Sequence, residues 1–290
     1  MTLVPPGAGA EYLRVRGGRL RVLRGGARGP ALLLLHGGGT DNAALSWYAA
    51  FEALGADHRV IAFDMPGYGG STGLEPLGSP EAMADLAALV LARLRVRRVV
   101  AVGSSMGGDV AMNLALRHPG LVAGLVLVAP GGLVPYLRNG VAHTAAWAAT
   151  RLPDPVILPL AGLANRFVET TLHRVVHAPS ALPSAVVAEF RREALRPGSA
   201  KGFLRYNQAT VGRHGMRNNL LSSVGALSVP TLFFHGENDP VVPVAGSRSA
   251  VAEMPNARLV TVPDCGHWAQ LEAHERFVEE VRAFLPATRR

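Results

Sequence analysis

The sequence predicts an α/β fold in which helices flank a mostly parallel sheet of eight strands. Short apolar runs alternate with helix-like segments over most of the 290 residues, which is typical of a parallel sheet with crossover helices. The later runs are apolar almost throughout, as expected for strands that are buried on both faces. Hydrophobic residues make up 49% of the chain, enough for one large core.

The strands are expected one after another along the chain. Gly17 and Gly18 join the two strands of an opening hairpin, and six buried strands follow it. The eight predicted strands are Glu11–Val15, Leu20–Arg24, Ala31–Leu35, Val60–Asp64, Val99–Gly103, Leu125–Ala129, Thr231–His235 and Arg258–Val262.

Three helices have clear signals. Ser79–Pro80–Glu81 predicts a helix start, because serine caps a helix, proline fits its first position and an acid suits its first turn. This helix is expected to reach Leu94. Apolar residues at helical spacing predict two more helices, Met106–Arg117 and Glu272–Leu285.

The alternation stops between Leu133 and Ser222. This region has no convincing strand, but several helix-like segments separated by prolines. A long helical insertion after the sixth strand predicts a lid over the carboxyl ends of the strands. We therefore expect a core of residues 1–132 and 223–290 and a lid of residues 133–222. Its large apolar side chains are expected to pack on the sheet or to line an acyl pocket; they include Trp147, Leu163, Phe167 and Phe203.

Composition narrows the classes of partner. The net charge is +8, but Lys201 is the only lysine and the arginines are scattered. A GC-rich genome accounts for this arginine usage, so we expect no nucleic-acid partner. No run of 18 apolar residues and no secretory signal are present, so no membrane partner is expected. Cys265 is the only cysteine, which rules out an internal disulfide framework and suits the cytoplasm.

The strongest chemical signal is Gly103–Ser104–Ser105–Met106–Gly107, at the junction of a buried strand and a helix. A tight turn there lifts a serine hydroxyl above the sheet at a helix N-terminus, where developing negative charge is favoured. Ser105 is the predicted nucleophile. Ser104 competes, but it lacks glycines at one-residue spacing on both sides.

A glycine run follows the third strand in His36–Gly37–Gly38–Gly39. Consecutive glycines let a backbone N–H approach a bound carbonyl, so Gly38 is the first predicted oxyanion donor. The amide of Met106, directly after the nucleophile, is the second. Gly37 and Gly39 are expected to lie beside the substrate. The plainer interpretation is an ordinary flexible loop.

A serine hydroxyl needs a base, and the chain has ten histidines. Only His267, in the loop after the last strand, completes the order Ser…Asp…His in loops that follow successive strands. Asp239 is the predicted acid that orients it. Glu237 and Asp264 are rival acids. Asp64 is expected to fix a loop instead.

These motifs resemble those of the α/β-hydrolase family. Five of them occur in the family's order, at residues 36–39, 64–69, 103–108, 236–243 and 266–268. The resemblance implies the α/β-hydrolase fold with a helical lid and a small-molecule substrate. It also implies a homodimer, because family members often pair. This chemistry needs no metal and no organic cofactor.

Within the family, the chain is similar to the meta-cleavage-product hydrolases, which cut carbon–carbon bonds in vinylogous diketones from ring degradation. Shared features are His-Gly-Gly-Gly, Ser-Met-Gly-Gly and Cys-Gly-His-Trp-Ala-Gln at 265–270. The resemblance implies that Arg191 binds a substrate carboxylate and that Trp268 lines the pocket. Ser104 stands where those enzymes have an asparagine that contacts substrate.

The alternatives remain open. The loop at 64–72 is similar to that of esterases and lactonases of the fold, which favours hydrolysis of an ester, lactone or thioester. A hydrolase-like protein that binds a small molecule with little turnover is a second class. A lyase or cyclase that uses the same serine is a third.

Overall fold

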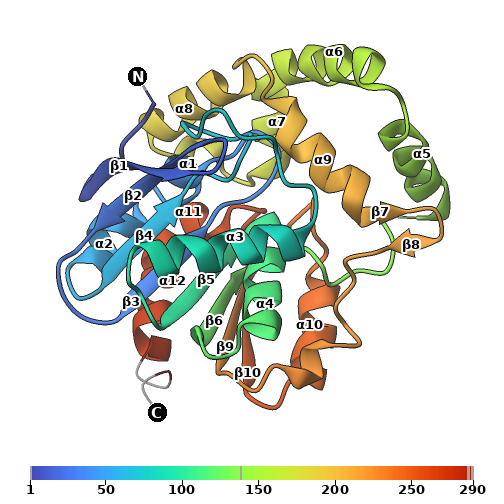
Figure 1. Cartoon of the computed structure of the whole chain (residues 1–290). Helices are drawn as coiled ribbons and strands as arrows, with labels where there is room; N and C mark the ends of the chain where they lie inside the picture. Colours follow the sequence, from blue (N-terminus) through green and yellow to red (C-terminus); the bar gives the residue numbers. More distant parts are fainter. Residues whose placement is uncertain (1, 138, 286–287, 289–290) are drawn as a thin grey trace.

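The computed structural model describes residues 2–137, 139–285 and 288. Its centre is a sheet of eight strands in the order β1-β2-β4-β3-β5-β6-β9-β10 (Figure 1). The strands are β1 (Ala8–Val15), β2 (Gly18–Gly25), β3 (Ala31–Leu35), β4 (Arg59–Phe63), β5 (Val99–Ser104), β6 (Val122–Val128), β9 (Thr231–Gly236) and β10 (Ala257–Val262). Only β1–β2 and β2–β4 pair antiparallel. The mostly parallel eight-stranded sheet predicted from the sequence is confirmed.

The inner strands β3, β5, β6 and β9 are buried at every position because their side chains pack in two cores, one on each face of the sheet. In β3, Leu33 and Leu35 pack in the cluster on one face, and Leu32 and Leu34 pack in the cluster on the other. Side chains of a strand alternate between faces, so a strand covered on both sides has no polar face.

Different helices cover the two faces. The first face packs against α3 (Pro80–Arg93), α4 (Met106–Arg117) and α10 (Val244–Glu253). The second packs against α1 (Ala43–Ser46), α2 (Ala50–Gly55), α11 (Ala269–Glu272) and α12 (His274–Phe284). The predicted cap of α3 is present, since Ser79 Oγ accepts a hydrogen bond from Ala82 N at 3.1 Å.

Four helices of the core, α1, α2, α10 and α11, were not predicted. The short helices α1 and α2 span too few residues to display a helical repeat. The α10 sequence is rich in small residues, so its apolar face is faint. The predicted helix Glu272–Leu285 is α12, and it begins at His274 because Ala273 has φ −118° and ψ 46°, outside the helical region. The short helix α11 precedes it.

The insertion between β6 and β9 is mainly helical. It contains α5 (Gly140–Thr150), α6 (Asp154–Ala164), α7 (Val168–Val175), α8 (Ser184–Ala194) and α9 (Ala200–Thr210). Figure 1 shows these helices gathered at one end of the sheet, with α5 and α6 on the outer rim. A small hairpin in the insertion was not expected; its strands, β7 (Val211–Gly212) and β8 (Gly215–Met216), have two residues each. Strands this short leave no alternating pattern.

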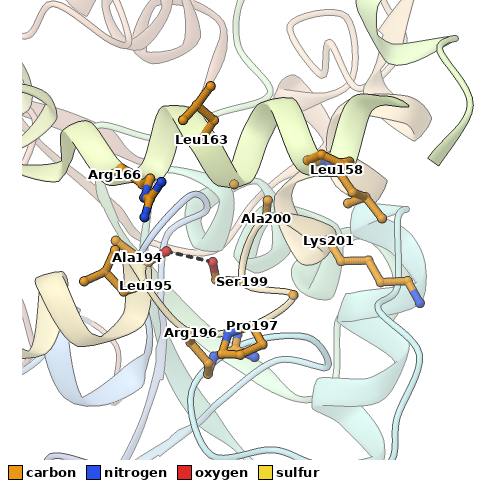
Figure 2. Close-up of a pocket in the computed structure, with 13 residues that line it drawn as sticks. Leu158, Leu163, Arg166, Ala194, Leu195, Arg196, Pro197, Ser199, Ala200 and Lys201 are labelled. Atoms are coloured by element: carbon orange, nitrogen blue, oxygen red, sulfur yellow. Dashed lines mark hydrogen bonds between the residues drawn. The ribbon is translucent and has the colours of Figure 1, made fainter. Parts of the chain in front are cut away.

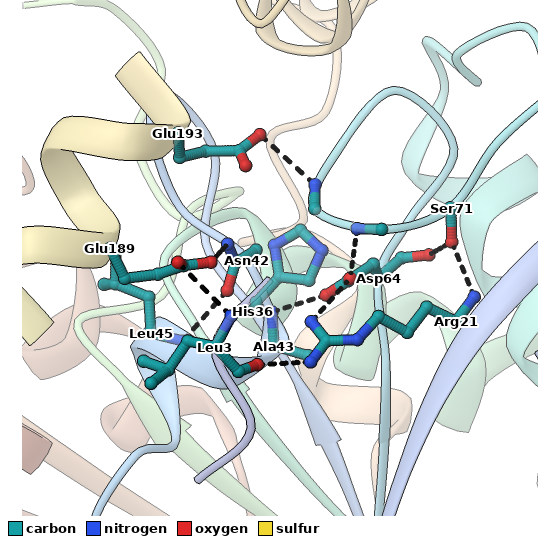
Figure 3. Close-up of polar contacts among 12 residues, drawn as sticks. Leu3, Arg21, His36, Asn42, Ala43, Leu45, Asp64, Ser71, Glu189 and Glu193 are labelled. Carbon is teal, nitrogen blue, oxygen red and sulfur yellow. Dashed lines mark hydrogen bonds and ion pairs between the residues drawn. The ribbon is translucent and has the colours of Figure 1, made fainter. Parts of the chain in front are cut away.

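Buried charges attach the insertion to the core (Figure 3). Two glutamates of α8 are almost fully buried: Glu189 accepts a hydrogen bond from Asn42 Nδ2 at 2.9 Å, and Glu193 accepts one from Gly69 N at 3.2 Å. Asp64 accepts from Ala43 N at 3.0 Å and Gly70 N at 2.7 Å. Asp64 therefore fixes the loop after β4, as expected, and α8 is docked on that loop.

Within the described ranges, no helix combines the length and hydrophobicity needed to cross a bilayer.

Candidate active site

Ser105 occupies a strained turn between β5 and α4. Its φ of 52° and ψ of −119° are unfavourable for a residue with a side chain. The flanking glycines are required by space. A Cβ on Gly103 would lie 2.2 Å from the carbonyl oxygen of Gly107, and a Cβ on Gly107 would lie 2.1 Å from that of Leu35. The sequence pattern Gly-x-Ser-x-Gly is thus explained by the close approach of β5, α4 and β3.

The glycine loop after β3 lies against this turn. A Cβ on Gly37 would be 3.4 Å from Ser105 Cβ, and a Cβ on Gly38 would be 3.6 Å from Met106 Cβ. Met106 is the first residue of α4, and the first amides of a helix have no acceptor within it. The two predicted oxyanion donors, Gly38 and Met106, are therefore neighbours beside Ser105.

We expect Gly38→Ala to lower kcat by about a hundredfold, the usual effect of losing one oxyanion donor, because the added methyl group shifts the loop and moves the Gly38 amide, which alanine retains, out of line with the oxyanion. The added methyl would lie 2.6 Å from Phe203 Cδ2, so the loop or the lid must move. Steady-state hydrolysis of a short ester measures the effect. Gly120→Ala is the matched control, because a Cβ there has no neighbour within 4 Å. Equal kcat values for both variants would contradict the assignment of Gly38.

His267 and Asp239 are in contact. His267 Nδ1 lies 2.7 Å from Asp239 Oδ2. The other carboxylate oxygen accepts from Val241 N at 2.7 Å and Val242 N at 2.9 Å. Burial acts to raise the pKa of Asp239, but hydrogen bonds from His235 and His267 outweigh it and hold that pKa well below its ordinary value. Asp239 is therefore a carboxylate that can hold the imidazole in one orientation.

The rival acids are elsewhere. Glu237 and Asp264 are both exposed on the surface. Asp264 also sits at a positive φ of 51°, in the turn that precedes His267. Of the three acids considered from the sequence, Asp239 is the one in contact with His267.

His235 is a supporting residue whose role sequence reasoning missed. It is fully buried at the end of β9. Its Nε2 lies 3.0 Å from the carbonyl oxygen of Val242 and 3.3 Å from Asp239 Oδ2. Its Nδ1 lies 2.9 Å from Ser247 Oγ. The sequence carried one usable signal: a histidine at the strand end, four residues before the acid.

A cavity of about 280 Å³ opens at Ser105 and His267. It includes four more of the predicted residues, Gly37, Gly38, Gly39 and Trp268. The Trp268 ring packs edge-on against Phe190, with centroids 5.3 Å apart. The remaining residues that line the cavity are Thr40, Asp41, Asn165, Thr171, Val175, Phe190, Phe203 and Val241.

Two residues predicted to contact substrate, Arg191 and Ser104, do not line this cavity. Arg191 lies on the exposed side of α8, in a separate groove with Ser184 and Leu195. It follows Phe190, which faces the cavity, and one residue further along a helix points about 100° away. Ser104 is fully buried at the end of β5, and its hydroxyl has no hydrogen-bond partner among the described residues.

The large lid side chains named from the sequence have different surroundings. Phe203 lines the cavity over Gly38. Leu163 and Phe167 are more than half exposed, and Trp147 lies under the guanidinium of Arg213, 5.6 Å from ring centroid to Cζ.

Asp41 is a buried carboxyl group at the cavity wall. It accepts hydrogen bonds from Gly37 N and Asn42 N, both at 2.8 Å, and from the Ser46 hydroxyl. Burial raises its pKa above the ordinary value, against the effect of these donors. Asp41 and His267 are the only ionisable groups among the described lining residues. Asp41 therefore fixes the glycine loop through Gly37. The described lining contains no arginine or lysine that could bind a substrate anion.

A second buried carboxyl group joins helix α4 to helix α9 of the insertion. Asp109, in the first turn of α4, accepts from Tyr206 Oη of α9 at 2.8 Å and from Asn218 Nδ2 at 2.6 Å. Burial raises the pKa of Asp109 to about 7 despite these bonds. Between pH 4 and pH 7, Asp109 therefore keeps its proton in the folded state but has lost it in the unfolded state, where its pKa is the ordinary 3.8.

This shift predicts a pH effect on stability. A raised pKa in the folded state means that stability falls as pH rises from about 4 to about 7. The unfolding free energies of wild type and Asp109→Asn are measured in urea at pH 5 and pH 7.5. Between these two pH values, the unfolding free energy of wild type should fall by more than that of Asp109→Asn. Asp154→Asn is the control, because the hydrogen bonds from Arg205 lower the pKa of Asp154, so neither partner titrates between pH 5 and pH 7.5. A parallel pH trend in wild type and Asp109→Asn would contradict the prediction.

Among the residues placed by the structure, no group of three or more His, Cys, Asp or Glu side chains is arranged to hold a metal ion.

Comparison with known proteins agrees with this architecture. The family model described as the alpha/beta hydrolase fold matches residues 30–274. A 2-hydroxymuconate semialdehyde hydrolase of Pseudomonas putida is 31% identical over 260 residues, which cover 87% of this chain and 86% of that protein. An uncharacterized protein of Mycobacterium tuberculosis is 31% identical over 285 residues, covering 96% and 81%. A bacterial membrane phospholipase A has a TM-score of 0.80 at 25% identity, covering 98% and 87%. The chain is a hydrolase that belongs to the α/β-hydrolase family and is related to its meta-cleavage-product hydrolases.

Proposed function

We propose that the protein hydrolyses a small, uncharged ester or lactone with a triad of Ser105, His267 and Asp239. One observation carries the proposal: Ser105 and His267 line the same cavity, and His267 Nδ1 lies 2.7 Å from Asp239 Oδ2. The strained turn at Ser105 supports it, because such strain is kept where a reactive group must be exposed.

The reaction follows from the roles of these groups. His267 takes the hydroxyl proton as Ser105 Oγ bonds to the substrate carbonyl carbon. The amides of Gly38 and Met106 stabilise the oxyanion. When the tetrahedral intermediate collapses, the carbon–oxygen bond to the alcohol breaks and His267 returns the proton to the leaving oxygen. Water, deprotonated by the same imidazole, then releases the acid from Ser105.

The cavity favours a small and uncharged substrate. Its volume of about 280 Å³ is at the lower end of the range for ligand pockets. Five of its lining residues are apolar or aromatic: Val175, Phe190, Phe203, Val241 and Trp268. A substrate carboxylate would meet Asp41 and would have no arginine or lysine among the described lining residues. We propose that residues 133–222 act as the lid that supplies Phe190 and Phe203.

Hydrolysis of a carbon–carbon bond is the second candidate. The Pseudomonas putida relative, named for hydrolysis of 2-hydroxymuconate semialdehyde, supports it. In this version the substrate carbon next to the carbonyl must be protonated first. Ser105 then bonds to the carbonyl carbon, the carbon–carbon bond breaks, and the protonated fragment leaves as a neutral molecule. Arg191 would bind the substrate carboxylate, which requires α8 to rotate from its observed position. For this reason we rank the candidate second.

A substrate panel separates the candidates. Neutral short-chain esters, a lactone and a ring-cleavage dienoate should be compared by kcat/KM. We expect turnover of the neutral esters or the lactone and little turnover of the dienoate. A preference for the dienoate would select carbon–carbon cleavage. Failure to turn over any of them, with saturable ligand binding, would support a binding protein instead.

A further inference from the structure

The outer face of the lid helix α6 is apolar. Seven residues of this helix are exposed, and none of them is polar or charged; they are Pro155, Val156, Pro159, Leu160, Gly162, Leu163 and Ala164. A helix on the surface of a globular protein normally turns polar residues to the solvent and apolar residues to the core. The apolar outer face of α6 is therefore unfavourable in contact with water and would be stabilised by contact with an apolar surface.

Larger side chains extend this face beyond the helix. Within α6, Val156, Leu160 and Leu163 are spaced by four and three residues, so they share one face of the helix. Leu152, just before the helix, and Phe167, in the 3₁₀ turn after it, add exposed apolar side chains at its two ends, and we call these five residues the stripe. Their exposed fractions run from 40% at Leu152 to 65% at Phe167. Scattered exposed leucines need no explanation, but a continuous stripe of large apolar side chains marks an interaction surface.

The insertion that carries this stripe is strongly positive. Residues 133–222 contain eleven Lys and Arg but only four Asp and Glu, so they hold a charge of +7 of the chain's +8. The asymmetry arises because acids are scarce in the insertion. A positive field of this kind attracts an anionic surface.

A cationic cavity lies beside the stripe, between α6 and the segment from Ala194 to Lys201 (Figure 2). Its volume is about 630 Å³, and no acidic residue lines it. Figure 2 shows Arg166 directed from the end of α6 toward this segment, with Leu163 on the other side of the helix. Arg196 and Lys201 pair with Glu193 and Glu75. Arg166 has no ion-pair partner in the part of the chain that the structure describes.

We propose that the outer face of α6 binds the surface of lipid bilayers that contain anionic phospholipid. The stripe enters the headgroup region, and the cavity of Arg166 takes a lipid phosphate. Apolar area and electrostatic attraction to anionic lipid are the two contributions that hold helices at such interfaces. Surface binding needs no membrane-spanning segment, and the sequence predicts none.

Charge and position favour a bilayer over a second copy of the chain. Pairing through α6 would bring two lids of equal positive charge together, which electrostatic repulsion opposes. Asn165 lines the cavity of Ser105, and the next residue, Arg166, lines the outer cavity. Contact at α6 would bring the Ser105 cavity close to apolar substrates dissolved in the membrane.

Vesicle sedimentation tests the proposal without any catalytic readout. The full chain is mixed with vesicles of phosphatidylcholine alone, or of phosphatidylcholine with phosphatidylglycerol. We expect stronger binding to the mixed vesicles, and binding weakened by about tenfold or more in Leu160→Ser/Leu163→Ser, which loses apolar contact area. Arg166→Glu should weaken binding to the mixed vesicles only, with an effect that decreases as salt is added.

Leu89→Ser is the matched control, because Leu89 is a leucine of α3 with 41% exposure outside the lid. It should bind vesicles like wild type. The thermal unfolding temperature should stay unchanged in all these variants, which verifies folding. Three results would each overturn the proposal: no binding of wild type to mixed vesicles, equal loss in Leu89→Ser, or a wild-type dimer that dissociates in Leu160→Ser/Leu163→Ser while vesicles do not bind.

Discussion

Ser105→Ala should lower kcat by at least about a thousandfold, as removal of a nucleophile from a catalytic triad does. In the proposed mechanism, Ser105 supplies the oxygen that bonds to the substrate carbonyl, and the alanine variant would retain only the proposed oxyanion donors and the cavity. The loss should appear in kcat, with KM changed little, because the missing interaction forms in the transition state. Single-turnover and steady-state hydrolysis of the best ester of the panel measure it.

Ser104→Ala is the matched control for this experiment. Ser104 is adjacent in sequence and also carries a hydroxyl, but it is buried outside the cavity. We expect near wild-type kcat for this variant. Comparable activity of Ser105→Ala and wild type would exclude Ser105 as nucleophile, and a large loss in Ser104→Ala alone would transfer the role to its neighbour.

Asp239→Asn should lower kcat by about a thousandfold to ten-thousandfold. An amide that replaces the carboxylate can donate a hydrogen to His267 Nδ1, which favours the tautomer with its proton on Nε2 and blocks proton transfer from Ser105. His235, 3.3 Å from Oδ2, and the two amides on Oδ1 keep the side chain in place, so folding should be preserved. The measurement is kcat across pH, together with the melting temperature.

Glu237→Gln provides the comparison for Asp239→Asn. Glu237 was the other acid in the loop after β9, and the structure leaves it exposed. It should retain full activity. If Glu237→Gln were as impaired as Asp239→Asn, the carboxylate that supports His267 would have been wrongly assigned.

The parts of the fold that were predictable are those with local signals. Apolar runs locate the six later strands to within a few residues, because strands covered on both faces are apolar along most of their length. The two strands of the opening hairpin are located by the glycine turn between them. The turn at Ser105 is visible in the sequence because only glycine fits at positions 103 and 107, where the neighbouring backbone is 2.1 to 2.2 Å from an added Cβ.

The walls of the candidate site were less predictable. Phe190 and Asn165 reach the cavity only because the lid helices cross above Ser105, and their crossing is a tertiary arrangement with no local pattern. The resemblance pointed to Arg191, and the observed rotation of α8 presents its neighbour Phe190 instead. No signal in the sequence singled out Asp41, which the structure makes the group that fixes Gly37.

The most direct test of the account is to identify the residue that a fluorophosphonate probe modifies. Such probes react with an activated serine, and peptide mapping by mass spectrometry locates the adduct. We expect one adduct, on Ser105, in wild type and in Ser104→Ala, and no adduct in Ser105→Ala. An adduct on another serine, or an unreactive wild type that still hydrolyses the ester, would contradict it.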